Sequence, residues 1–355
     1  MSRADRVAAR LAERQLDLLL VADLTNVRYL TGFTGSNAMA VVGEDVRRFV
    51  TDFRYVEQAR EQVPDFDREL APVEFLEAFA TGWPEGSLRV GFEDDHVTVR
   101  RFERLRAIVP ARIELVPAGG IVEAERMVKE PAEVERIRAA AALVDEVYGW
   151  LLEIGIVGRT EREVAVHLEH RMRELGAEGP SFPSIVASGE RGALPHARPS
   201  GVPIPAGTLV TLDLGARLDG YCSDCTRTWA TGDIPDELAE AYALVLGAQQ
   251  AALAVLRPGR AGREVDAVAR DLIAAAGHAE HFGHGLGHGV GLEIHEGPRL
   301  SRTAQSPLAA GNVVTVEPGV YLPGLGGVRI EDLVVLTDGG HEVLSGTSKD
   351  LLTVA

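Results

Sequence analysis

Short apolar runs alternate with amphipathic segments over about the first 120 residues. Residues 16–22 (LDLLLVA) predict a buried strand, and residues 40–51 predict two strands around a turn at Gly43 and Glu44. Residues 88–94 predict a further strand. Apolar positions with helical spacing occur in residues 5–15, 54–63 and 99–109. Strands that alternate with helices indicate a mixed α/β domain.

The pattern changes near residue 125, where a long amphipathic helix is expected to open a second domain. Pro131 stands where the first residue of a helix would be, and acidic residues follow in the first turn. The apolar positions on one face of this helix are Val134, Ile137, Ala141, Val144, Tyr148 and Leu151. We therefore expect two domains, residues 1–125 and residues 126–355, which suits a chain of 355 residues.

The second predicted domain contains a faint internal repeat. The segments GRTEREV (158–164) and GRAGREV (259–265) share Gly-Arg and Arg-Glu-Val, and each begins a helical stretch. The strands VTLDLG (210–215) and VTVEPG (314–319) follow in the same order, and each leads to a second acid through a Gly-x-x-x-acid tail. These matched features indicate a duplicated half-domain with a pseudo-two-fold axis.

Each copy of the repeat carries two acids on an apolar hairpin. Asp213 lies inside the first strand, and the return strand is expected to bring Asp224 beside it. Glu317 and Glu331 hold the matching positions in the second copy. Ionised carboxylates in apolar surroundings repel one another unless one or two divalent cations lie between them. The hairpins alone leave metal binding and four separate salt-bridged carboxylates about equally favoured.

A glycine-rich segment, residues 281–296 (HFGHGLGHGVGLEIHE), holds four of the ten histidines. Its alternating glycines exclude a helix and permit a substrate or metal to approach the backbone closely. A histidine cluster in such a loop favours a functional role. His196 lies in another loop rich in Gly and Pro, and by itself it is more typical of an exposed loop histidine.

The net charge of −17 disfavours nucleic acids and anionic membrane surfaces as partners. The two cysteines, Cys222 and Cys225, are too few for a secreted disulfide scaffold, and no second pair completes a zinc site. The first 20 residues lack the apolar core of a signal peptide, and no uninterrupted apolar run of 18 residues occurs. A reducing cytoplasm is the expected location.

Five residues, in order along the chain, resemble the metal ligands of the pita-bread metallopeptidases: Asp213, Asp224, His288, Glu317 and Glu331. The matching stretches are LDLGARLDGYCSDCTRT, GHGLGHGVGLEIHE, TVEPGVY and GGVRIED. This family includes methionine aminopeptidase, Xaa-Pro aminopeptidase, Xaa-Pro dipeptidase and creatinase. The stretches NVRYLTGFTGSNA and TDFRYVEQA resemble the creatinase-type N-terminal domain, which methionine aminopeptidases lack. The resemblance implies a creatinase/ribonuclease H-like α/β domain followed by an α+β pita-bread catalytic domain.

The resemblance also implies roles for individual residues. Asp213 would chelate one metal ion, and Asp224 and Glu331 would bridge two ions. His288 and Glu317 would complete the shell of the other ion, and Glu317 would also shuttle a proton. The implied cofactors are two divalent ions, manganese first and cobalt or zinc as alternatives, because oxygen ligands dominate. Further roles are implied for the catalytic histidines His196 and His295 and for His284, Arg329 and Tyr321 at the substrate pocket.

The activity that the resemblance favours is that of an Xaa-Pro aminopeptidase, which releases the first residue from peptides with proline second. The alternative is an Xaa-Pro dipeptidase (prolidase), which accepts only dipeptides and needs a group that holds the free carboxylate of proline. A non-catalytic peptide-binding protein on this fold is a remote alternative, because such relatives usually lose metal ligands. The resemblance also implies a homodimer.

Overall fold

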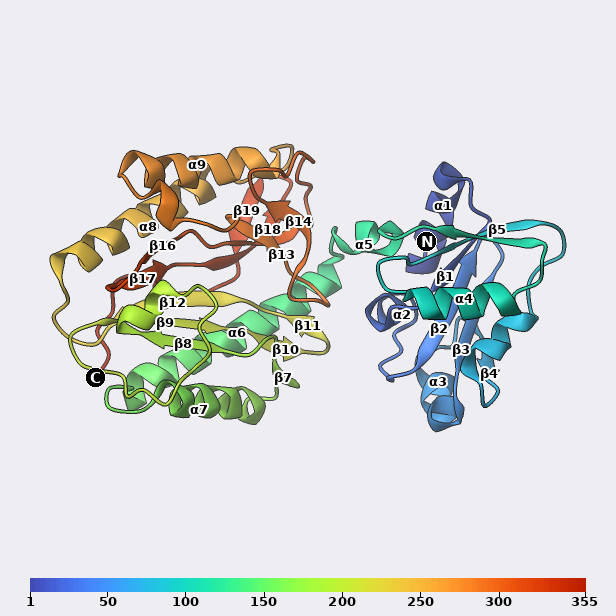
Figure 1. The fold of residues 1–355 in the computed structure, drawn as a ribbon, viewed down its shortest axis with the longest axis horizontal. Helices are drawn as coiled ribbons and strands as arrows, with labels where there is room; N and C mark the ends of the chain where they lie inside the picture. Colours follow the sequence, from blue (N-terminus) through green and yellow to red (C-terminus); the bar gives the residue numbers. More distant parts are fainter. The chain divides into compact units, whose positions relative to one another are not determined.

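The computed structural model describes residues 1–355, which divide into two compact units, Met1–Arg126 and Met127–Ala355 (Figure 1). The strands of the first unit are β1 (Leu18–Val21), β2 (Ala38–Gly43), β3 (Arg47–Thr51), β4 (Asp67–Leu70), β5 (Leu88–Phe92) and β6 (Ile113–Pro117). They form one sheet in the order β4-β3-β2-β1-β5-β6. The β1–β2 and β2–β3 pairs are antiparallel and the other pairs are parallel, which confirms the predicted mixed α/β class.

Helices connect these strands and supply part of the core of the first unit. They are α1 (Arg3–Leu11), α2 (Leu24–Thr31), α3 (Val56–Gln62), α4 (Val99–Ile108) and α5 (Ile121–Arg126). Helix α2 is capped at both ends. The Asp23 side chain accepts a hydrogen bond from the Thr25 N–H at the start, and Gly32 ends the helix with φ 79°.

The second unit contains two pairs of long helices, α6 (Pro131–Ile154) with α7 (Glu161–Glu174) and α8 (Asp236–Val255) with α9 (Gly262–Ala275). Helix α6 begins at Pro131 as expected, and of its six predicted core positions only Val134 is not fully buried. Helices α7 and α9 begin within the two repeated segments. In Figure 1 one pair lies on each side of the strands of this unit.

The strands of the second unit also fall into two halves. The first half contains β7 (Gly179–Pro180), β8 (Ile185–Ser188), β9 (Leu209–Leu214), β10 (Ala216–Leu218), β11 (Tyr221–Cys222) and β12 (Cys225–Ala230). The second half contains β13 (Gly287–Gly289), β14 (Glu296–Leu300), β15 (Val313–Val316), β16 (Gly319–Leu322), β17 (Gly326–Arg329), β18 (Asp332–Thr337) and β19 (Gly340–Val343). Separate apolar cores lie under the two helix pairs, as the duplicated half-domain predicts.

Helix α8 is the one helix long and apolar enough to cross a membrane by length and composition, with a hydropathy of 1.3. Its buried side chains, among them Leu238, Tyr242 and Val245, belong to the apolar core of the second half. A core helix meets the same criteria, so this finding is weak evidence for a membrane span.

Candidate metal centre

The four predicted acids lie in or beside paired strands from both halves of the second unit. Asp213 is in β9, and the residue directly opposite it on β12 is Thr226 rather than Asp224. Asp224 precedes β12, because β10 and β11 form a small hairpin of their own between β9 and β12. Glu317 follows β15 and Glu331 precedes β18, so this antiparallel pair carries both acids at one end.

One cavity of about 480 Å³ brings the predicted residues together. Its wall includes the histidine segment, the loop that carries His196, and residues of both hairpins. All ten predicted site residues line it: His196, Asp213, Asp224, His284, His288, His295, Glu317, Tyr321, Arg329 and Glu331.

His288 and the carboxylates face one another closely enough to share a cation. One ligand atom from each of Asp224, His288 and Glu331 lies within 4.8 Å of the other two. His288 Nε2 lies 3.3 Å from Glu317 Oε1 and 3.6 Å from Asp224 Oδ2. His288 Nδ1 lies 3.0 Å from the carbonyl oxygen of Gly289, which can only accept a hydrogen bond. Nδ1 therefore carries a proton, and Nε2 faces the carboxylates as a possible ligand.

Two buried carboxylate oxygens, Asp213 Oδ1 and Glu331 Oε1, have no hydrogen-bond donor. The second oxygen of each carboxylate is held. Asp213 Oδ2 accepts from Arg329 Nη2 at 2.7 Å, and Glu331 Oε2 accepts from the Thr226 hydroxyl at 2.7 Å. Each carboxylate is thus oriented by one oxygen and has the other available. Hard divalent cations prefer such oxygen ligands, so the residues present fit a metal centre.

The pKa shifts of these four acids indicate that the site has too little positive charge to balance them all in the ionised form. Burial raises the pKa of Asp213, Asp224 and Glu331, and the charges of neighbouring carboxylates raise all three further. Burial acts on Glu317 in the same direction, but hydrogen bonding to His288 and the charge of His288 lower its pKa to about 2. Divalent cations would supply the charge that lets all four carboxylates ionise.

A directed chain of hydrogen bonds crosses the wall of the cavity. His284 Nδ1 lies 2.8 Å from the carbonyl oxygen of Gly285, so this nitrogen is the donor. His284 Nε2 then accepts from the Tyr321 hydroxyl at 2.9 Å, and the same hydroxyl accepts from Arg329 Nη1 at 3.0 Å. Burial lowers the pKa of His284, which favours the neutral ring that this chain requires. Arg329 thereby links His284 to Asp213.

The two predicted catalytic histidines are the exposed members of the set. The ring of His295 packs edge-on against that of His288, with 4.4 Å between the ring centroids. Burial and the charge of His288 lower the pKa of His295, so its ring is neutral near pH 7. His196 lies in the loop after the 3₁₀ helix η4 (Gly189–Ala193). Both rings remain accessible to a molecule in the cavity.

The structure adds three residues that the sequence analysis did not single out. Thr226 is fully buried and hydrogen-bonds Glu331, and its only signal is its place two residues after Asp224 on the same strand face. Arg198 and Arg299 are exposed side chains in the cavity wall. Neither arginine lies in a distinctive sequence pattern. Their place in the cavity wall could not be predicted, because it depends on how the loops pack.

Each of the two units matches a known protein family. Residues 135–338 match metallopeptidase family M24, and residues 3–128 match the creatinase/prolidase N-terminal domain. The chain belongs to metallopeptidase family M24. The predicted family, fold class and metallo-exopeptidase class are therefore confirmed.

Relatives of this M24 chain cover nearly its whole length. It is 44% identical over 338 residues to an uncharacterized peptidase of Bacillus subtilis, which covers 95% of this chain and 96% of the relative. It is 35% identical over 356 residues to the Xaa-Pro dipeptidase of Pyrococcus furiosus, covering 99% of each.

Two solved structures match nearly the whole chain. The Xaa-Pro dipeptidase from Bacillus anthracis has a TM-score of 0.95 at 38% identity, covering 99% of each chain. The X-Pro aminopeptidase from Thermotoga maritima has a TM-score of 0.89 at 36% identity, covering 97% of this chain and 99% of that one.

Proposed function

We propose that this M24 chain is an Xaa-Pro dipeptidase, which hydrolyses the bond between a first residue and a C-terminal proline. The observation that carries the proposal is the exposed side chain of Arg299, which lines the same cavity as the carboxylate centre. A guanidinium holds a free carboxylate through two parallel N–H···O bonds. Proline presents a free carboxylate in a dipeptide and an amide in a longer peptide. The two relatives named Xaa-Pro dipeptidase support the same choice over the aminopeptidase that the motifs alone favour.

The residues that would hold the divalent ions are Asp213, Asp224, His288, Glu317 and Glu331. The two unpartnered carboxylate oxygens and the orientation of the His288 ring support this set. Manganese is the proposed ion because four of the five ligands are carboxylates, and cobalt and zinc are the alternatives. Divalent ions bound there would activate water and polarise the scissile carbonyl.

The side chains of the cavity would move the proton and hold the substrate. Glu317 accepts a proton from the attacking water and delivers it to the proline nitrogen as the C–N bond breaks. His295, with a neutral ring near pH 7, donates one N–H to the carbonyl oxygen as negative charge develops there. His196 contacts the substrate from the opposite loop. The hydrogen-bond chain through Tyr321 keeps His284 in one orientation.

The test is to follow release of the first residue from an Xaa-Pro dipeptide, an Xaa-Pro amide and an Xaa-Pro-Yaa tripeptide with the manganese-loaded protein. Cleavage of the dipeptide with little cleavage of the other two is the expected result. Equal cleavage of all three would refute the dipeptidase assignment. No cleavage of any substrate, with manganese bound, would refute the peptidase assignment and revive a peptide-binding role.

Arg299→Met tests the group that carries the proposal. The substitution should lower kcat/KM for the dipeptide by about tenfold, because a guanidinium–carboxylate pair in a solvent-exposed setting contributes about 1–1.5 kcal/mol. The Xaa-Pro amide should be cleaved as by the parent protein, because it has no free carboxylate for Arg299 to bind. Arg198→Met is the matched control, because it removes the same charge from another exposed side chain of the wall. An equal loss on both substrates would contradict the role of Arg299.

An Xaa-Pro aminopeptidase is the second candidate. The full-length similarity to the X-Pro aminopeptidase from Thermotoga maritima favours it. The tripeptide separates the two candidates, because an aminopeptidase requires space in the cavity for residues beyond proline.

A further inference from the structure

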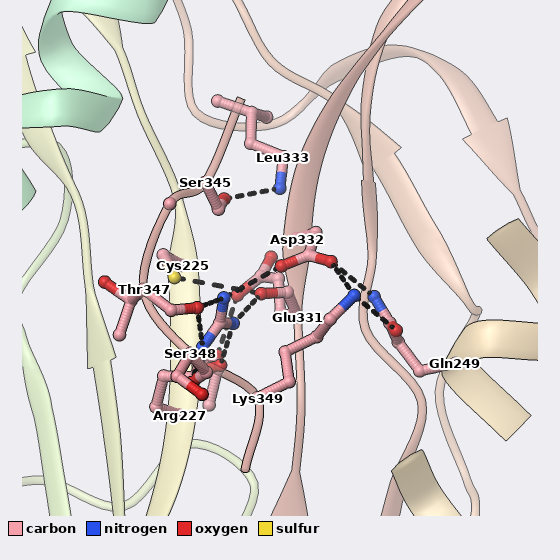
Figure 2. A network of polar contacts seen from close by, with 12 residues as sticks. Cys225, Arg227, Gln249, Glu331, Asp332, Leu333, Ser345, Thr347, Ser348 and Lys349 are labelled. Carbon is pink, nitrogen blue, oxygen red and sulfur yellow. Dashed lines mark hydrogen bonds and ion pairs between the residues drawn. The ribbon is translucent and has the colours of Figure 1, made fainter. Parts of the chain in front are cut away.

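A buried polar network lies directly beside Glu331 (Figure 2). Its centre is Arg227 on β12, a fully buried side chain that pairs with Asp332 on β18 at 2.8 Å. Arg227 also donates to carbonyl oxygens of the segment after β19, at 2.6 Å to Thr347 and 3.0 Å to Ser348. The network thus ties two core strands to a segment more than a hundred residues beyond Arg227 in sequence.

The other oxygen of Asp332 completes the network. Asp332 Oδ2 accepts from Lys349 Nζ at 2.6 Å and from Gln249 Nε2, on α8, at 2.8 Å. Lys349 Nζ also donates to the side-chain oxygen of Gln249 at 3.1 Å. Asp332 is therefore fixed from both sides by two cationic side chains and one amide. The Lys349 side chain keeps 26% of its exposure, so it is the accessible end of the network.

Hydrogen bonds from the network hold the main chain of Glu331, one of the proposed metal ligands. Arg227 Nη1 donates to the carbonyl oxygens of Glu331 and of Thr226, the latter at 2.9 Å. The Glu331 N–H donates to the carbonyl oxygen of Thr226 at 3.1 Å. Both polar groups of the Glu331 backbone are thus held, and its side chain is oriented by the Thr226 hydroxyl. A shift of Asp332 or Arg227 would therefore move the carboxylate of Glu331.

We propose that Lys349 is a positioning residue for the metal centre, acting on Glu331 through Asp332 and Arg227. The inference rests on the proposed ligand set but not on the choice between dipeptidase and aminopeptidase. Charge and position predict opposite effects. Loss of the Lys349 positive charge would by itself strengthen cation binding, because like charges repel. Loss of its hydrogen bond to Asp332 would instead weaken cation binding, because Glu331 would no longer be held in place. Partners that orient metal ligands typically contribute about 10–100-fold to metal affinity.

The decisive experiment measures manganese affinity of the full-length metal-free protein by calorimetry. Lys349→Met is expected to weaken binding by about tenfold, the low end for residues that orient ligands, because Lys349 acts through Asp332. Lys349→Arg keeps the charge and a donor, and should restore most of the affinity. Arg138→Met is the matched control: it removes one positive charge and an exposed ion pair with Glu342 on β19. Its affinity should stay at that of the parent protein.

A second variant and a ligand variant make each outcome decisive. Gln249→Met removes a donor to Asp332 without a change of charge, and should weaken manganese binding in the same direction as Lys349→Met. Unchanged or tighter binding in both variants, even with a lower melting temperature, would overturn the inference and leave a structural role only. Glu331→Gln checks the proposed function separately. If this variant binds manganese like the parent protein, the ligand set itself is wrong. If it loses binding while Lys349→Met and Gln249→Met do not, only the positioning role fails.

Discussion

Thr226→Val would test how much the buried hydrogen bonds behind the carboxylates contribute to cation binding. Thr226 is fully buried. Its hydroxyl donates to Glu331 Oε2 at 2.7 Å and accepts from Arg329 Nε at 3.0 Å. Valine replaces this hydroxyl with a methyl group, so both hydrogen bonds are lost while a β-branched side chain remains in the strand.

The structure sets the size of the expected effect. The bond from the charged Arg329 contributes about 1.5–3 kcal/mol, and the bond to Glu331, whose pKa burial raises in the metal-free protein, contributes about 1 kcal/mol. Glu331 would be left without any donor to its carboxylate, because Oε1 already has none. Arg329 would keep its bonds to Asp213 and Tyr321. We therefore expect the unfolding free energy of the metal-free protein to fall by about 3 kcal/mol and manganese to bind about 10–100-fold more weakly.

Urea denaturation measures the unfolding free energy, and competition with a fluorescent chelator measures manganese affinity. Thr226→Ser keeps the hydroxyl and should restore the affinity. Thr211→Val is the matched control, because the buried Thr211 hydroxyl makes only long contacts, 3.3 Å to Thr228 and 3.4 Å to Gly327. Parental affinity in Thr226→Val, or equal losses in the serine and valine variants, would refute the reasoning.

Three further substitutions probe other parts of the chain. Burial raises the pKa of Glu93 from 4.5 to about 7, so in that window the folded chain keeps a proton that the unfolded chain has released. The unfolding free energy of the first unit should therefore fall by about 3 kcal/mol as the pH rises from about 4.5 to about 7. In Glu93→Gln, this free energy, measured by hydrogen exchange, should depend less steeply on pH. An unchanged pH dependence would contradict this. Glu161 is fully buried and accepts hydrogen bonds from the N–H and hydroxyl groups of Ser188 and Ser200. Glu161→Gln should therefore lower the unfolding free energy by about 2–4 kcal/mol and speed proteolysis between these serines. An unchanged cleavage rate would count against this role of Glu161. Glu317→Ala should abolish peptide hydrolysis and preserve the circular dichroism spectrum, and substantial residual turnover would remove Glu317 from the mechanism.

Local patterns in the sequence were enough to predict much of the fold and of the proposed site. The apolar period predicted strands β1, β2, β3 and β5 and helix α6 within a few residues. The repeated strand-and-acid pattern led to Asp213, Asp224, Glu317 and Glu331, which line one cavity. These features are readable because side-chain direction alternates along a strand and recurs every few residues along a helix.

Other features of the protein depended on the tertiary structure. Opposite Asp213 on β12 lies Thr226 rather than Asp224, because the β10–β11 hairpin takes up the intervening residues. The placement of Arg299 beside the carboxylates also depends on loop packing.

The network that holds Glu331 is the clearest case of what the sequence alone could not determine. Arg227 meets Asp332 across 105 positions, and Lys349 meets Gln249 across 100. The sequence determined which residues carry charge and which strands are apolar. Only the tertiary structure decided which charges meet, because a buried ion pair depends on the distance and desolvation of groups whose separation along the chain does not predict their separation in space.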